Sequence, residues 1–145
     1  MKVLWGKSDY FYDLTFIRDI MIKTVLLIGS GGFIGSVARY YLSKLNLSLS
    51  LFSIPVGTLI VNITGSLLIG ILMGLSERST LLNSDSRLFL MVGLCGGFTT
   101  FSSFTMENLT LIHNGQFLPV LVYTGASLIL GFMAVFFGYA LTSLI

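Results

Sequence analysis

Along the chain, hydrophobic residues form long runs, and polar residues gather in short segments between them. A membrane-crossing helix needs about twenty apolar residues, since the hydrocarbon core of a bilayer is about 30 Å thick. Four runs meet this requirement: 24–41, 51–75, 88–106 and 117–145. The segments between them, SKLNLS, SERSTLLNSDSR and ENLTLIHNGQ, are short and polar, which is typical of loops. The pattern therefore predicts an all-α membrane protein with four transmembrane helices and both termini on one side.

Residues 1–20 differ from these runs because they mix six charged residues with aromatic ones. They lack the apolar core of a signal peptide, and they are too polar to span a membrane. One interpretation is an N-terminal extension that forms an interfacial helix or is disordered. The other, which we favour, is that translation begins at Met21, since MIKTVLLIGSGG is a natural start for a first membrane helix. In both cases residues 21–145 form the four-span domain.

The choice between these starts changes the predicted orientation in the membrane. In the whole chain, the side of the termini and the second loop carries six lysines and arginines, against Arg39 and Lys44 on the other side. The positive-inside rule then predicts one orientation, with the termini in the cytoplasm. From Met21 the count is three against two, which sets almost no preference. A chain so balanced can insert both ways and pair with its inverted copy.

Composition supports the membrane assignment and excludes several functions. Hydrophobic residues make up 54% of the chain and charged residues 10%, whereas soluble domains usually carry about 25% charge. The lysines and arginines are scattered, so nucleic acid is not an expected partner. Cys95 is the single cysteine, which excludes an internal disulfide and a multi-cysteine metal site. The sequence offers no paired nucleophile and base, so an enzyme is not expected.

Small and polar residues recur four positions apart inside the predicted helices. In lipid, helices associate through close backbone contact at such small residues, so these pairs predict a tight bundle. The pairs are Gly31/Gly35, Gly70/Gly74 and Gly93/Gly97. On the second predicted helix, Thr58, Asn62, Ser66 and Gly70 share one polar face. Two interpretations of Asn62 remain open on this pattern: a hydrogen bond between helices, or the lining of a polar path.

The segment GGFTTFSSFT, residues 96–105, lies inside the third predicted helix and differs from the rest of it. Glycine costs about 1 kcal/mol relative to alanine in a helix, and threonine and serine hydroxyls compete for backbone carbonyls. The segment therefore predicts a break near the middle of the third helix. Freed carbonyls there suit a small hard cation. Phe101 and Phe104 can point the same way beyond the break, and their positive ring edges suit a small anion.

Three segments resemble the signature blocks of the Fluc (CrcB-type) fluoride channels of bacteria: GGFIGSVARYYLS, GTLIVNITGSLLIG and GLCGGFTTFSSFTMEN. They occur in the family's order, one in each of the first three predicted helices, and the resemblance covers residue 21 to the C-terminus. It implies a chain in the bacterial inner membrane that exports fluoride passively and contacts membrane lipid. It also implies an antiparallel, dual-topology dimer. The second member would be this chain in inverted orientation or an oppositely oriented paralogue.

The resemblance also implies roles for individual residues. Backbone carbonyls of Gly96 and Thr99 from both subunits would surround a structural sodium ion, and Arg39 would lie at the pore vestibule. The chain departs from the family at Gly131, where a track of hydroxyl groups usually continues, and in residues 1–20, which have no counterpart. The residues implied to line the fluoride pore are Asn62, Phe101, Phe104, Ser102, Ser103, Tyr123 and Ser127.

Two other functions fit the size of the chain. Small dual-topology multidrug exporters have a similar size, but they rely on a glutamate in the first span, and residues 24–41 contain none. A non-transporting membrane scaffold subunit would explain the glycine pairs. It would not explain the polar face of the second helix or the GGFTTFSSF segment. The predicted function is therefore a fluoride-specific channel that lowers cytoplasmic fluoride.

Overall fold

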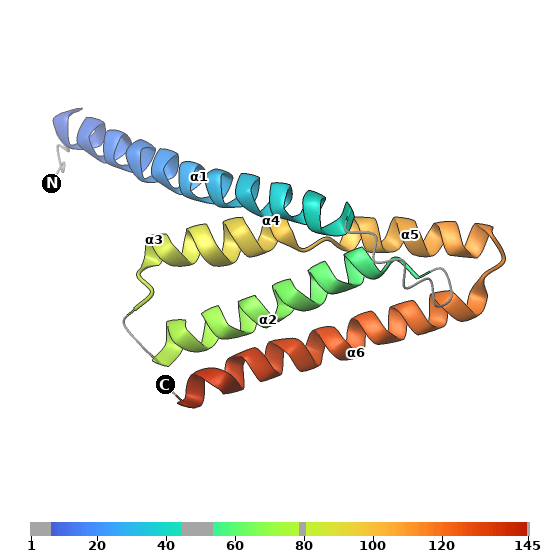
Figure 1. The fold of residues 1–145 in the computed structure, drawn as a ribbon. Coiled ribbons are helices and arrows are strands. Elements are labelled where there is room, and N and C mark those ends of the chain that lie inside the picture. The colour runs from blue at the N-terminus through green and yellow to red at the C-terminus, as the bar shows by residue number, and fades with distance from the viewer. Residues whose placement is uncertain (1–6, 45–53, 79–80, 145) are drawn as a thin grey trace, which may run out of the picture.

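The computed structural model describes residues 7–44, 54–78 and 81–144 (Figure 1). Within these ranges every regular element is a helix, and four segments are long and apolar enough to cross a membrane: Phe16–Lys44, Val56–Arg78, Ser84–His113 and Phe117–Leu141. The prediction of an all-α, four-span chain is confirmed, and the protein is a multi-pass membrane protein. Most of the predicted first loop, the start of the second predicted span and residues 1–6 lie outside the described residues.

Three of the spans are continuous helices, whereas the third is built from several pieces. α1 is Lys7–Lys44, α2 is Val56–Arg78 and α6 is Phe117–Leu141, which is followed by the short 3-10 helix η2, Thr142–Leu144. The third span consists, in order, of α3 (Ser84–Arg87), the π-helix η1 (Leu88–Cys95), α4 (Gly96–Phe98) and α5 (Phe101–His113). The interruption between α4 and α5 lies where the sequence predicts a break.

α1 is longer than a membrane crossing requires. It begins at Lys7 rather than at residue 24, so the first span continues into the N-terminal segment as one helix. Its 38 residues correspond to roughly 57 Å, about twice the thickness of the hydrocarbon core. One end of α1 must therefore extend past the hydrocarbon. A translation start at Met21 stays a prediction.

The end of the third span also differs from the predicted one. α5 does not stop at Met106 but continues to His113, because apolar residues recur on its inner side through Leu111. Beyond it Gly115 adopts a positive φ of 71°, which glycine tolerates. The Gly115 and Gln116 N–H groups donate to carbonyls of the last turn at 2.9 Å each. Left-handed glycine and these two bonds form a C-cap that ends the helix.

The helices pack in two pairs, as Figure 1 shows: α1 lies along η1 and α4, and α2 lies along α6. Backbones meet closely in both pairs. A methyl group added at Gly35 would meet the Leu94 carbonyl oxygen, and one added at Gly97 would meet the backbone of Gly32. Between α2 and α6, Gly70 meets the backbone of Val135 in the same way. The glycine pairs therefore act as predicted, by letting neighbouring helices approach.

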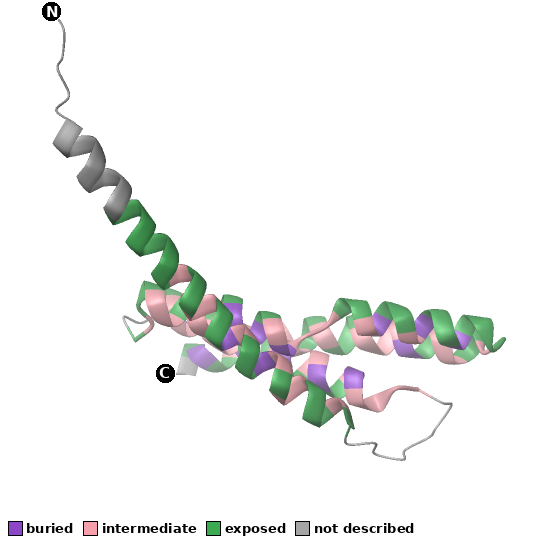
Figure 2. Ribbon diagram, turned by 90° about the horizontal axis from the view of Figure 1, so that it is seen from above, coloured by how far each residue is buried: buried purple, intermediate pink, exposed green. Residues whose placement is uncertain are grey.

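Many large apolar side chains of the single chain are exposed, and Figure 2 shows exposed residues, in green, along the helices. The buried side chains are few and include Val61, Phe98, Phe104 and Tyr123. On α6, by contrast, large apolar side chains point outward, and Phe136 is 76% exposed. An apolar exterior of this extent is suited to lipid and to contact with other helices in the membrane.

Candidate functional site

The break in the third span consists of two residues in extended conformation. Thr99 has φ −77° and ψ 154°, and Thr100 has φ −147° and ψ 118°, so neither continues the helix. α5 then begins at Phe101, and the Thr100 hydroxyl accepts a hydrogen bond from the Ser103 N–H at 3.2 Å. Threonine in this position is an N-cap, which satisfies one of the donors that a helix start leaves open. The sequence prediction of a break is confirmed.

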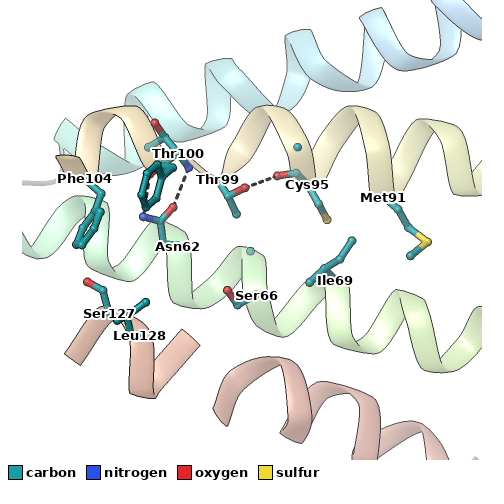
Figure 3. Close-up of a pocket in the computed structure, with 13 residues that line it drawn as sticks. Asn62, Ser66, Ile69, Met91, Cys95, Thr99, Thr100, Phe104, Ser127 and Leu128 are labelled. Atoms are coloured by element: carbon teal, nitrogen blue, oxygen red, sulfur yellow. Dashed lines mark hydrogen bonds between the residues drawn. The ribbon is translucent and has the colours of Figure 1, made fainter. Parts of the chain in front are cut away.

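Asn62 on α2 forms hydrogen bonds with both the N–H and the carbonyl group of Thr100. The Thr100 N–H donates to Asn62 Oδ1 at 2.8 Å, and Asn62 Nδ2 donates to the Thr100 carbonyl oxygen at 3.1 Å (Figure 3 draws the contact). The side-chain amide thus replaces the pairing that a helix would have given this peptide unit. Nδ2 carries two hydrogens and this bond uses one, so the second hydrogen remains able to bind an anion.

Arg39 and Ser36 on α1 satisfy a second freed carbonyl. The Gly97 carbonyl oxygen accepts from Arg39 Nε at 3.1 Å and from the Ser36 hydroxyl at 3.4 Å. A cation at this point also complements the negative end of the helical turn formed by α4. Arg39, predicted at a pore vestibule, is therefore held against the break, half-buried, by a carbonyl of the third span.

The carbonyl oxygens of Gly96 and Thr99 differ from those of Gly97 and Thr100. Across the described residues, no side chain or backbone N–H donates a hydrogen bond to either of them. Both residues line the same cavity, and Gly96 is exposed. Uncharged carbonyl oxygens are ligands that hard cations accept. The pair is therefore compatible with the part of a cation site that the family resemblance implies for this chain.

A cavity of about 430 Å³ opens beside the break, between α2, the third span and α6 (Figure 3). Six of the residues predicted to bind ions line it: Asn62, Gly96, Thr99, Phe101, Phe104 and Ser127. Other lining residues had not been assigned to the site, and these include Ser66, Met91, Cys95 and Thr100. Segments far apart in the sequence therefore meet at one space that is open on the surface of the chain.

The two phenylalanines of the segment after the break lie in different surroundings. Phe104 is buried against Tyr123, with ring centroids 5.1 Å apart and planes inclined by 58°. Phe101 is 75% exposed, and its ring centroid lies 5.7 Å from that of Phe104. Spacing three thus brings the rings together at the cavity, as predicted. One ring is fixed by packing and the other is free on its outer side.

Tyr123 has another role in the fold, because it binds a carboxylate. Its hydroxyl donates to Glu107 Oε2 at 2.6 Å, and the Thr58 hydroxyl donates to Glu107 Oε1 at 2.6 Å. This network joins α2, α5 and α6, and Tyr123 is fully buried and is not among the residues that line the cavity. Glu107 does not lie at a helix end, because α5 runs on for six residues past it.

The serines predicted to line the pore also lie in different surroundings. The Ser127 hydroxyl is buried at the cavity and has no hydrogen-bond partner among the described groups. Ser103 accepts a hydrogen bond from the Thr100 hydroxyl at 3.1 Å, and the Ser102 hydroxyl lies 3.2 Å from it. Neither Ser102 nor Ser103 lines the cavity as the described residues define it. The Thr100 side chain therefore organises the first turn of α5 around these hydroxyls.

Residues 26–139 match the model of one protein family, which is described as CrcB-like protein, Camphor Resistance (CrcB). The match covers the second and third spans in full and most of the first and fourth. This chain belongs to the CrcB-like protein family. The three segments that carry the resemblance to the fluoride channels lie within the matched residues, and so do the residues that line the cavity.

Relatives of this CrcB-like chain carry a more specific name. One from Azobacteroides pseudotrichonymphae is 41% identical over 122 residues, which cover 84% of this chain and 98% of the relative. Another, from Chlorobium phaeobacteroides, is 46% identical over 117 residues, which cover 81% of this chain and 90% of the relative. A third, from Chlorobium luteolum, is 45% identical over 115 residues, which cover 79% of this chain and 88% of the relative. Each is named fluoride-specific ion channel FluC.

Proposed function

We propose that this CrcB-like chain is a fluoride-specific ion channel, which lowers cytoplasmic fluoride by passive export across the inner membrane of a bacterium. The names of its relatives support this function. The observation that carries it is the cavity beside the broken third span, where the Asn62 amide, the Ser127 hydroxyl and two phenylalanine rings meet at membrane depth. All of these groups are uncharged, so an anion entering the cavity meets donors without a cation that would trap it.

The proposed path replaces the water around fluoride with neutral donors. Asn62 keeps one Nδ2 hydrogen for the ion, and Ser127 offers a hydroxyl without a protein partner. Phe101 and Phe104 contribute the positive edges of their rings. Fluoride is small and accepts hydrogen bonds strongly, so close donors favour it over larger halides. Ser102 and Ser103 lie in the first turn of α5. Rotation of their hydroxyl groups would pass the ion onward.

We further propose an antiparallel dimer. Its second member would be an inverted copy of this chain or an oppositely oriented paralogue. The cavity is open on one side and Phe101 is 75% exposed beside it, so a partner helix in the membrane would close the path. The free carbonyls of Gly96 and Thr99 support the same arrangement. They supply two oxygens, and a two-fold axis near the break would supply two more.

The proposed ion on that axis is sodium, held by these carbonyl oxygens. A hard cation there would join the two subunits, and its charge would make the neutral interior more favourable to anions. We expect that replacing sodium by N-methylglucamine lowers the unfolding temperature of the purified channel and slows fluoride efflux. Differential scanning fluorimetry and a fluoride electrode measure the two effects. Unchanged stability and efflux in sodium-free buffer would remove the cation from the proposal.

The function is tested by reconstituting the full chain in liposomes loaded with fluoride or chloride. We expect rapid efflux of fluoride and no measurable efflux of chloride. Asn62→Asp should abolish fluoride efflux, because a carboxylate repels the anion and loses the Nδ2 donor, while its oxygen can still accept from the Thr100 N–H. Size-exclusion chromatography checks that the variant still assembles. Equal passage of both halides, or a fully active Asn62→Asp variant, contradicts the assignment.

The two competing functions give different results in the same vesicles. A scaffold subunit would pass neither halide. A multidrug exporter would move cationic drugs in exchange for protons, for which it needs an intramembrane carboxylate in the first span. In the first span, Phe16–Lys44, the single acidic residue is Asp19, which forms an ion pair with Arg18 at 3.5 Å, and both side chains are exposed. This arrangement does not favour an exporter.

A further inference from the structure

One hydroxyl at the cavity has no part in the function proposed so far. Ser66 lies on α2 one turn beyond Asn62, a rise of about 6 Å along the helix. It lines the same cavity as Asn62 and Ser127, and Figure 3 shows it between the ribbons of α2 and α6. Its side chain therefore faces the proposed path at a level that neither of the other two donors occupies.

The Ser66 hydroxyl, like that of Ser127, makes no hydrogen bond to another group among the described residues. Within a helix, serine and threonine usually bond a backbone carbonyl three or four residues back. Ser30 does so to the Leu27 carbonyl at 3.1 Å, and Thr110 does so to the Met106 carbonyl at 3.0 Å. Ser66 makes no such bond, and no group in the described ranges pairs with it. Its proton is therefore available to a ligand in the cavity.

The neighbouring helix leaves room for that hydroxyl. Gly131 on α6 has no side chain, and a Cβ built on it would lie 3.8 Å from Ser66 Oγ. This is ordinary van der Waals contact, so a small residue at position 131 would fit without displacing Ser66. It would also bring a new hydroxyl within reach of the place that Ser66 now occupies. The two positions face each other across the space between α2 and α6.

We infer that Ser66 is a further hydrogen-bond donor to permeating fluoride, and that it extends the path beyond Asn62 and Ser127 along α2. The inference rests on the proposed channel function, since it assigns a residue to the path of the same ion. It adds a hydrogen-bond donor on α2, opposite Gly131 of α6, to that function. Removing the hydroxyl at position 66 and introducing one at position 131 gives the inference a specific test.

The test compares initial rates of fluoride efflux from liposomes for five forms of the full chain. They are the wild type, Ser66→Ala, Ser66→Thr, the double variant Ser66→Ala with Gly131→Ser, and Ser30→Ala. Removing one bond to an ion should slow Ser66→Ala about tenfold. Ser66→Thr should stay near the wild-type rate because it keeps the hydroxyl. The double variant should recover most of the loss, and Ser30→Ala, whose hydroxyl bonds its own helix, should match the wild type.

Three results would overturn the inference. Wild-type efflux by Ser66→Ala would mean that the hydroxyl is not on the path. Slow efflux by Ser66→Ala, Ser66→Thr and the double variant alike would mean that packing, and not the hydroxyl, sets the rate. A wild type that passes no fluoride would overturn the channel function itself and this inference with it. The first two results leave the channel function standing, so the two failures are distinguishable.

Discussion

Asn62 combines two tasks in one amide group. Its oxygen and one of its hydrogens hold the Thr100 peptide unit, and the residue lines the cavity, where the proposed path uses the second hydrogen. A backbone break at membrane depth would otherwise leave a donor and an acceptor unpaired, at a cost of about 1–3 kcal/mol each. The residue that repairs the break is therefore also the residue that the proposed path uses. The two interpretations left open by the sequence are compatible.

The phenylalanines give a residue-scale prediction because their burial differs. Phe101→Ile should slow fluoride efflux strongly and leave the unfolding temperature of a single subunit almost unchanged, since the ring is 75% exposed. Phe104→Ile should lower both the efflux rate and the unfolding temperature, because the Phe104 ring packs on Tyr123. Efflux and thermal unfolding in detergent measure the two effects. A Phe101→Ile variant that conducts at the normal rate would show that its ring edge does not serve the ion.

Some site residues were predictable and others were not, for reasons that lie in the side chains. Asn62 and Phe101, which line the cavity, were predictable because their residue types and spacings are visible in their own segments of sequence, whereas Ser127 was predicted from the family resemblance. The Thr58–Glu107 bond joins residues 49 positions apart, and nothing local to Glu107 indicates a partner. The hydroxyl of Thr58 on the polar face of α2 was the available signal. A polar face inside a span implies an acceptor elsewhere in the chain.

At the scale of elements, the third span shows how far local chemistry determines structure. Glycine and hydroxyl residues at 96–100 predicted the break, and the two extended threonines occur there. The π-helical conformation of η1 was not predicted, because its sequence LFLMVGLC has no marker that distinguishes it from an α-helix. Its close packing against α1 is the feature that accompanies it. Tertiary contact therefore accounts for what the local sequence does not.

The contact between α1 and the third span yields a prediction with a matched control. Gly35→Ala places a methyl group against the Leu94 carbonyl oxygen and the Phe98 N–H, so the two helices must separate. Gly29→Ala, six residues earlier on the same helix, meets nothing within 4 Å. We expect Gly35→Ala to lower the unfolding temperature in detergent clearly, and Gly29→Ala to leave it equal or slightly higher. Equal effects of both variants would contradict the observed contact.

At the scale of the whole molecule, an ion pair between α1 and the third span marks the point beyond which α1 extends past the other helices. Lys23 Nζ lies 2.6 Å from Asp85 Oδ2 at the start of the third span. Residues 7–22 extend beyond this point as one helix, by roughly 24 Å, and Figure 1 shows α1 projecting past the other helices. The segment carries Lys7 and Arg18, so its charge lies on the same side as Arg78 and Arg87.

This arrangement predicts the orientation of the 145-residue chain. Six lysines and arginines on the side of the termini, against two on the other, should place the C-terminus in the cytoplasm in nearly every molecule. Replacing Lys2, Lys7 and Arg18 by glutamine leaves three against two, and both orientations should then appear. A C-terminal fluorescent or phosphatase reporter in bacteria distinguishes the two sides of the membrane. If the unmodified chain shows both orientations equally, the N-terminal charges do not set its topology, and one gene product is sufficient for the proposed antiparallel dimer. If it shows one orientation, the dimer requires an oppositely oriented paralogue, and fluoride efflux by the purified chain alone should increase in the glutamine variant.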